Sequence, residues 1–197
     1  MATEVEIAKL ALSHIGDRYD LTALTDSTPE AEQINLVFDT VRDMLLREHP
    51  WKFAQTFYSP PEWGGGVPAQ WAYQFNYPPD ALKIIEIVNP LGRDLPPIPF
   101  DIASEYNSRV ILCDVEEPEF RYTRQVTDTS EFDVYFTEAF AARLAARVVM
   151  PLTGDSRMLS LMVELANRIV GAAKSEDANE GVEPSKNRNP DWIRARA

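Results

Sequence analysis

The sequence predicts an α+β protein in which helix pairs from both ends of the chain form a four-helix unit with a small antiparallel β lobe inserted between them. Three observations support this fold class. Capped amphipathic repeats occupy residues 1–50 and 127–174, a strand-like alternation occupies 51–126, and periodicity is lost over 175–197. The 197 residues are 45% hydrophobic and 10% aromatic, which suffices for a packed core with an extended C-terminal tail.

The first 50 residues predict a helix pair. Thr3 and Glu6 have the spacing of a capping box, and Gly16 ends the first helix. Thr28 caps the second helix, which we expect to end at Pro50. Each helix has one apolar face. The expected buried residues are Ile7, Leu10, Ala11, His14 and Ile15 on the first helix and Ile34, Val37, Phe38, Val41, Met44 and Leu45 on the second.

The middle of the chain predicts the β lobe. Alternation and β-branched residues indicate strands that we expect to form one small antiparallel sheet. These strands are Trp71–Tyr77, Leu82–Val88, Arg109–Cys113 and Phe120–Thr123. The lone cysteine, Cys113, should be buried as a small hydrophobe. The run from Glu62 to Gly66 reads as a flexible glycine loop with an aromatic residue on it.

The C-terminal part predicts the second helix pair. Ser130 is the expected N-cap of a helix that reaches Met150 and ends at Pro151, and Asp155 caps the last helix. Their expected buried faces contain Phe132, Phe136, Phe140, Leu144 and Val148, then Leu159, Met162, Ala166, Ile169 and Ala173. Alanines at 139, 142, 145 and 146 allow close helix approach. From Ser175 the apolar pattern is lost, and the tail begins.

The residue types of common catalytic and metal sites are absent or wrongly spaced. The two histidines, His14 and His49, lack a second ligand at metal spacing. Gly64–Gly66 has no lysine or following helix to hold a phosphate. Glu116 and Glu117 are adjacent on an expected turn, whereas a glycosidase needs carboxylates that face each other across a cleft. We therefore expect a protein that is not an enzyme and has no cofactor and no metal.

The charge and hydropathy of the chain argue against nucleic-acid and membrane binding. A net charge of −12 disfavours phosphate binding, and Arg121 and Arg124 are expected to pair with acidic residues across strands. No apolar run approaches the roughly 18 residues that span a bilayer. The N-terminus shows no signal-peptide pattern, so we expect a soluble protein made in a cytoplasm.

What remains are signals of protein contact. Trp63 lies on the glycine loop, and Trp192 and Ile193 lie in a polar tail that a partner would order. The alternative is that both tryptophans pack on their own domain.

The order of segments resembles podovirus tail tubular protein A, a family of head-to-tail adaptors. The resemblance covers nearly the whole chain through motifs that are weak singly and more specific in their order and spacing. These motifs are Ala11–Gly16, the helix Ala31–His49 followed by Pro50–Ala54, the strand–Pro–Asp–strand step Phe75–Ile84, and Tyr122–Ala178 with Phe132 and Asp133 before an alanine-rich helix.

The resemblance implies a ring, commonly of twelve copies, that lies between the portal protein and the tail nozzle (a tail tubular protein B-like component). Genomic DNA would pass through it without specific binding, and the protein would reside in the virion. The tail at 175–197 becomes the candidate portal contact, through Lys186, Arg188, Trp192, Ile193 and Arg194. The loop Trp63, Gly64, Gly65 and Gly66 becomes the candidate contact with a neighbouring copy or the nozzle.

Two alternatives remain open from the sequence. One is a connector or head-completion protein at another position of the tail. The other is a cell-wall hydrolase, which two opposed carboxylates in a cleft would favour.

Overall fold

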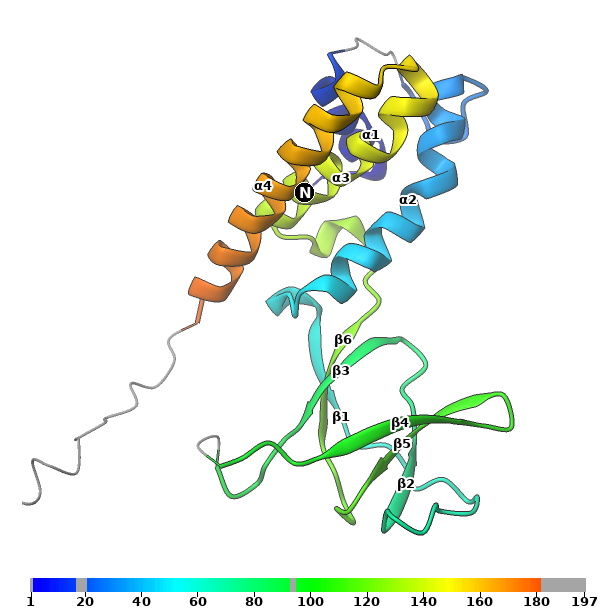
Figure 1. Ribbon diagram of the computed structural model, residues 1–197, viewed down its shortest axis with the longest axis vertical. Helices are drawn as coiled ribbons and strands as arrows, with labels where there is room; N and C mark the ends of the chain where they lie inside the picture. Colours follow the sequence, from blue (N-terminus) through cyan, green and yellow to red (C-terminus); the bar gives the residue numbers. More distant parts are fainter. Residues whose placement is uncertain (1, 17–20, 93–94, 182–197) are drawn as a thin grey trace, which may run out of the picture.

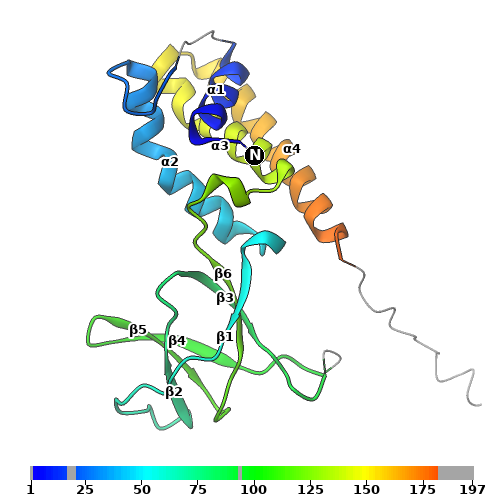
Figure 2. The ribbon, with the colours of Figure 1, turned by 180° about the vertical axis from the view of Figure 1, so that it is seen from behind.

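The computed structural model describes residues 2–16, 21–92 and 95–181 (Figure 1). These residues form four α-helices and two small antiparallel sheets, which confirms the α+β fold class. The helices gather in one unit and the strands in a β lobe, and the two lie end to end in both views (Figures 1 and 2). Within these ranges, no helix is both long enough and apolar enough to cross a membrane.

Helix α3 is the centre of the helical unit. The four helices are α1 (Glu4–Ile15), α2 (Pro29–Glu48), α3 (Val134–Thr153) and α4 (Ser156–Asn179). Each of the other three packs against α3. The side chains that α3 buries are Phe136, Ala139, Phe140, Ala141, Ala142, Leu144, Ala145, Val148 and Val149. The buried alanines of α3 let neighbouring helices approach closely. Its buried phenylalanines fill the space between the helices elsewhere along its surface.

Most of the expected helix ends are confirmed, because their signals are local. Thr3 and Glu6 form a complete capping box, and Gly16 closes α1 in the left-handed conformation. Thr28 caps α2 through the backbone N–H of Ala31. The expected burial of Met44 is wrong, since this side chain is 54% exposed at the edge of the α2–α3 contact. Short apolar side chains next to it fill the space that the periodicity assigned to it.

Both expected ends of α3 are wrong. The N-cap is Asp133, whose Oδ1 accepts a hydrogen bond from the N–H of Tyr135 at 2.8 Å. Ser130 instead lies in a short 3₁₀ turn, η2 (Thr129–Glu131), where its own N–H donates to Asp128. At the other end α3 passes through Pro151 and closes at Gly154, which has a φ of 67°. Pro151 has no N–H to donate, so the helix lacks one hydrogen bond there, but this loss is confined to its last turn.

Helix α4 also extends beyond the expected start of the tail at Ser175. It continues to Asn179 because Ala173 and Asp177 are both buried against the rest of the body. Asp177 is polar, which is why the apolar periodicity does not reveal this last stretch of helix.

The β lobe contains two three-stranded antiparallel sheets, so the expectation of one sheet is wrong. One sheet has the order β1–β6–β3 and the other β2–β5–β4. The strands are β1 (Gln55–Tyr58), β2 (Tyr73–Asn76), β3 (Ala81–Ile87), β4 (Phe100–Glu105), β5 (Ser108–Cys113) and β6 (Phe120–Arg124). Two of them, β1 and β4, were not expected. Both are edge strands whose side chains are mostly exposed, so neither shows the alternating burial pattern.

The two sheets share one apolar core. Phe75 of β2, Ile84 of β3, Ile111 of β5 and Phe120 of β6 are buried together in it. Cys113 is fully buried here, as expected. The strands of one sheet cross those of the other (Figure 1), which closes the lobe around this core.

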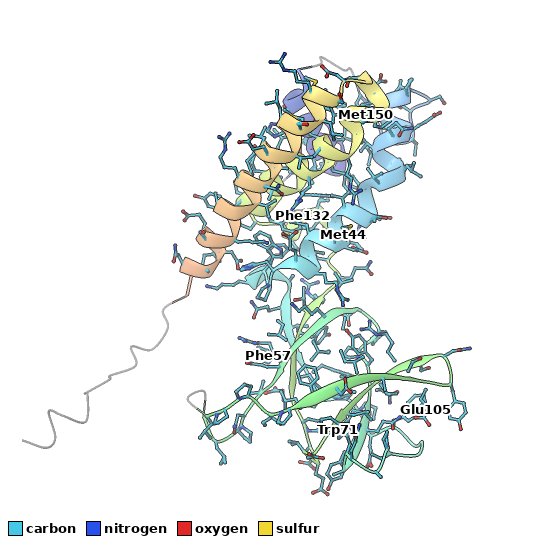
Figure 3. All side chains as sticks on the ribbon, in the orientation of Figure 1. Met44, Phe57, Trp71, Glu105, Phe132 and Met150 are labelled. Atoms are coloured by element: carbon cyan, nitrogen blue, oxygen red, sulfur yellow. The ribbon has the colours of Figure 1, made fainter. Side chains whose placement is uncertain are left out.

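The chain enters and leaves the lobe through one strand pair. β1 pairs antiparallel with β6, with Gln55 opposite Thr123. Directly above this pair lies an aromatic cluster in which the rings of Trp51 and Phe53 meet Phe136 at 5.1 and 5.0 Å between centroids. The short helix η1 (Lys52–Ala54) turns the chain from α2 into β1. Figure 3 places Phe132, another member of this cluster, on the helical side of the junction.

Two leucines on α2 test the packing of the helical unit. Leu45 is 1% exposed, whereas Leu36 is 73% exposed. Leu45→Ala should lower the free energy of unfolding by about 2–5 kcal/mol, since it leaves a cavity beside α3. Leu36→Ala should change it by less than about 0.5 kcal/mol. Urea unfolding followed by circular dichroism measures both, and equal effects would contradict the packing described.

Candidate interaction surfaces

Both histidines of the described residues lie beside carboxylates in structural contacts. His14 Nε2 lies 3.3 Å from Glu138 Oε1, and His49 Nε2 lies 2.7 Å from Asp177 Oδ2. Across residues 2–16, 21–92 and 95–181, no three His, Cys, Asp or Glu side chains are grouped to hold a metal ion. Glu116 and Glu117 are exposed on the turn between β5 and β6. This geometry offers no opposed pair of carboxylates at that turn.

The last turn of α4 is fastened to the start of the β lobe. Asp177 is 8% exposed and uses both carboxylate oxygens: Oδ2 contacts His49, and Oδ1 accepts from the N–H of Lys52 at 2.9 Å. The Lys52 ammonium donates to the carbonyl of Ala178 at 3.4 Å. We call this contact the α4 clamp, formed by His49, Lys52 and Asp177. It fixes the point from which the chain leaves the helical unit.

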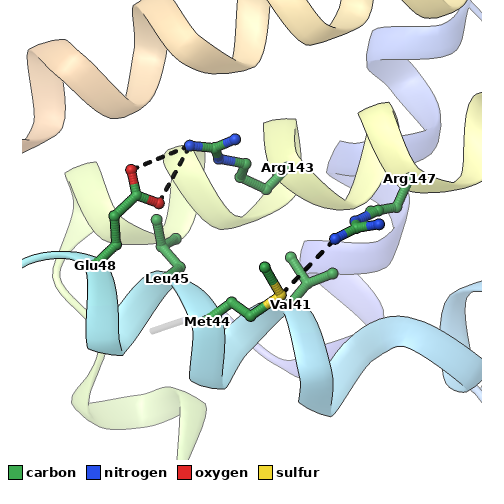
Figure 4. Close-up of a pocket in the computed structure, with 6 residues that line it drawn as sticks. All are labelled: Val41, Met44, Leu45, Glu48, Arg143 and Arg147. Atoms are coloured by element: carbon green, nitrogen blue, oxygen red, sulfur yellow. Dashed lines mark hydrogen bonds and ion pairs between the residues drawn. The ribbon is translucent and has the colours of Figure 1, made fainter. Parts of the chain in front are cut away.

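Two ion pairs of Glu48 also join α4 to the rest of the helical unit. Glu48 at the end of α2 pairs with Lys174 of α4 at 2.7 Å. It also pairs with Arg143 of α3 at 3.2 Å (Figure 4). It therefore joins three helices. The hollow beside it also has Met44 and Arg147 on its rim and a volume of about 70 Å³. A space of this size is far below the several hundred Å³ of ordinary ligand sites.

The larger depression lies on the β lobe. It has a volume of about 380 Å³ and is lined by Trp63, Asn76, Tyr77, Pro78, Pro79, Ala81, Asn107, Ser108 and Arg109. We call it the β-lobe groove. The Arg109 guanidinium lies over the ring of Tyr77, 3.7 Å from its centroid, and the N–H of Tyr77 donates to the Arg109 carbonyl at 3.2 Å. The groove is therefore aromatic and proline-rich, with a cation fixed at one side.

The loop that carries Trp63 is held against the sheet. The Trp63 N–H donates to the carbonyl of Gln74 at 2.7 Å. A Cβ on Gly65 would lie 2.7 Å from the Glu105 carboxylate, which accepts a hydrogen bond from the buried amide of Gln74. At Gly65 the backbone therefore lies close to a hydrogen-bonded polar pair, which leaves little room for a side chain there. A Cβ on Gly64 would have no atom within 4 Å.

The turn at Asp80, between the groove residues Pro79 and Ala81, is held by hydrogen bonds from Tyr122 and Gln125. The Tyr122 hydroxyl donates to Asp80 Oδ1 at 3.0 Å, and the N–H of Gln125 donates to the Asp80 carbonyl at 2.7 Å. Burial raises the pKa of Tyr122 to about 12, and the hydrogen bond to Asp80 acts in the same direction. Pro78 and Pro79 precede this turn and are thereby held in place.

The expected pairing of the β6 arginines with acidic residues across strands is confirmed for Arg121 and wrong for Arg124, whose acidic partner lies outside the sheet. Arg121 pairs with Glu86, its register partner on β3, at 3.0 Å. Arg124 pairs with Glu131 in η2. Neither guanidinium stands in a cluster of basic residues that would suit a phosphate backbone.

Two comparisons with known proteins give no family for this chain. No model of a known protein family and no curated protein sequence matches this chain.

Only one of the two candidate contacts lies among the described residues. Lys186, Arg188, Trp192, Ile193 and Arg194 lie outside the described residues. Trp63 lines the β-lobe groove, and Gly64, Gly65 and Gly66 follow it on the rim loop. Sequence reasoning missed the partners of Trp63 in the groove, which come from two separate segments, 76–81 and 107–109. It also missed the α4 clamp, whose His49 and Asp177 are 128 positions apart.

Two adjacent acids test the α4 clamp. Asp177→Ala removes the contacts to His49 and Lys52 and should cost about 1–3 kcal/mol, because it leaves buried partners unsatisfied. Amide hydrogen exchange in the last turn of α4 should accelerate, while exchange in α3 changes little. Glu176→Ala is the matched control, since Glu176 is exposed. Unchanged exchange in Asp177→Ala would show that the clamp does not hold the helix end.

A pH series tests the Tyr122–Asp80 contact. Because the folded state raises the pKa of this phenol from 10.0 to about 12, its contribution is fully present below pH 10 and is lost as the pH rises towards 12. Tyr122→Phe should reduce this alkaline loss of stability and cost about 1 kcal/mol at neutral pH. Tyr106→Phe is the control, because Tyr106 is 86% exposed. Parallel pH curves for wild type and Tyr122→Phe would refute the role of this contact.

Proposed function

We propose that this chain is a structural, non-catalytic subunit of a tailed-phage head-to-tail adaptor ring of the tail tubular protein A type. In this role it joins the portal to the tail nozzle and continues the DNA channel. The observation that carries the proposal is the end-to-end arrangement of a helical unit and an inserted β lobe, with the last turn of α4 fastened beside their junction. A subunit placed between two partners needs two separated ends of this kind.

The α4 clamp supports the portal contact. Asp177 holds the last turn of α4 beside His49 and Lys52, so residues 182–197 begin from a fixed place. A segment that becomes ordered on its partner costs conformational entropy, and a fixed starting point lowers that cost. The helical unit thus presents the tail to the portal, and the β lobe extends towards the nozzle.

The charge and chemistry of the chain support a passive channel wall. The net charge of −12 disfavours adhesion of DNA, which must slide through the ring. The histidines of the described residues serve as partners of Glu138 and Asp177. Both features favour the adaptor over a cell-wall hydrolase, for which no pair of opposed carboxylates stands out in the described part of the chain.

The native mass of the protein, alone and mixed with the portal of the same phage, tests the proposal. We expect a monomer alone and a defined multiple of it on the portal, because the portal templates the ring. Deletion of 182–197 keeps α4 and its clamp intact, and it should weaken portal binding by about tenfold or more. Deletion without effect would exclude the tail as the portal contact. No association of the full chain with the portal would reject the adaptor.

A further inference from the structure

A proline-rich segment that the fold leaves exposed lies immediately before β4. Residues 95–99 read Leu-Pro-Pro-Ile-Pro, and each of them is a proline or precedes one. Proline fixes its own φ and restricts the preceding residue to extended conformations, so the whole run favours a polyproline II helix. It belongs to no helix or strand, and Leu95, Pro96, Pro97 and Pro99 are all exposed. We call it the proline segment.

The proline segment presents one defined face. A polyproline II helix has three residues per turn, so Pro96 and Pro99 share a face. Ile98 is partly buried and packs against the core of its own lobe, which anchors the segment and turns the two prolines outward. The segment is thus ordered in advance, with little entropy left to lose on binding.

The β-lobe groove has the chemistry that recognises such a segment. Flat aromatic side chains pack well on proline rings, and the half-buried Trp63 supplies one. The ring of Tyr77 packs against the core of the lobe and holds the Arg109 guanidinium in place beside it. A polyproline II backbone makes no internal hydrogen bonds, so its carbonyls need donors. Arg109, fixed over Tyr77, and the amide of Asn107 line the groove as donors, whereas the Asn76 amide already donates to the Pro61 carbonyl at 3.4 Å.

The groove and the proline segment of one copy lie at opposite ends of β4. The segment precedes Phe100, whereas the groove begins at Asn107, just after Glu105 ends the strand. Six residues of strand separate them by about 20 Å. Figures 1 and 2 agree, since the β4–β5 turn and the start of β4 project from opposite sides of the lobe. A copy therefore cannot fill its own groove with its own segment.

We propose that the proline segment of one copy binds in the β-lobe groove of the next copy. Two different complementary surfaces on opposite sides make a head-to-tail contact, and repeated contacts of this kind form a ring when the rotation between neighbouring copies closes. This inference rests on the proposed adaptor ring and names the surfaces through which its copies meet. It assigns Trp63 to the neighbouring copy rather than to the nozzle.

A blocked peptide of the sequence Leu-Pro-Pro-Ile-Pro tests the recognition without any ring. Titrated into the full chain, it should shift the indole N–H signal of Trp63 in the ¹H–¹⁵N spectrum and leave that of the fully buried Trp51 unchanged. Trp63→Ala should weaken binding by about tenfold or more. A peptide in which the prolines that correspond to Pro96 and Pro99 are changed to alanine should bind more weakly by a similar factor. Tyr106→Ala is the matched control, because this exposed aromatic lies beside the groove without lining it. No shift at Trp63 would overturn the proposal.

Cross-linking on the portal tests whether the contact joins neighbours. Pro97→Cys and Asn107→Cys in one chain should give, on mild oxidation, a ladder of covalent multimers, since each copy links to two others. Either substitution alone should give no ladder, and the native Cys113 is buried. Portal-bound protein that stays monomeric on oxidation would overturn the proposal. Failure to bind the portal at all would instead reject the adaptor, and the peptide titration would still decide the groove.

Discussion

The pairing of β1 with β6 is the contact on which the arrangement of the molecule depends. It brings the exit from α2 and the entry to α3 side by side, although 68 positions separate the paired residues Gln55 and Thr123. Once they are adjacent, Trp51 and Phe53 can pack on Phe136, and the Trp51 indole can donate to the Leu45 carbonyl at 2.8 Å. The β lobe is therefore an extension held at its base by two strands and an aromatic cluster.

The same junction determines where the tail starts. α4 packs along α3 and ends beside η1, where the α4 clamp fastens it. The three segments that meet here are the end of α2, the start of β1 and the end of α4. A load applied to the tail would pass through the clamp into both units, which suits a subunit that connects two partners. The β-lobe groove lies on the β lobe, away from this junction.

The parts of the fold that sequence reasoning found depend on local signals. The capping box at Thr3, the cap at Thr28 and the helical periodicity need only residues a few positions apart. The parts it missed depend on distant partners. β1 and β4 are strands because β6 and β5 pair with them, α4 reaches Asn179 because Asp177 meets His49, and Trp63 lines a groove whose other walls come from Tyr77 and Arg109. Pro151 gave a wrong helix end, because α3 accommodates this proline in its last turn and ends only at Thr153.

The orientation of the subunit on the portal can be tested by one measurement. A cryo-electron microscopy reconstruction of the chain bound to the portal of the same phage would show which end meets the portal. We predict a closed ring with the helical units against the portal and the β lobes projecting away from it, side by side. A ring with the β lobes against the portal, or portal particles with no added ring, would contradict the account.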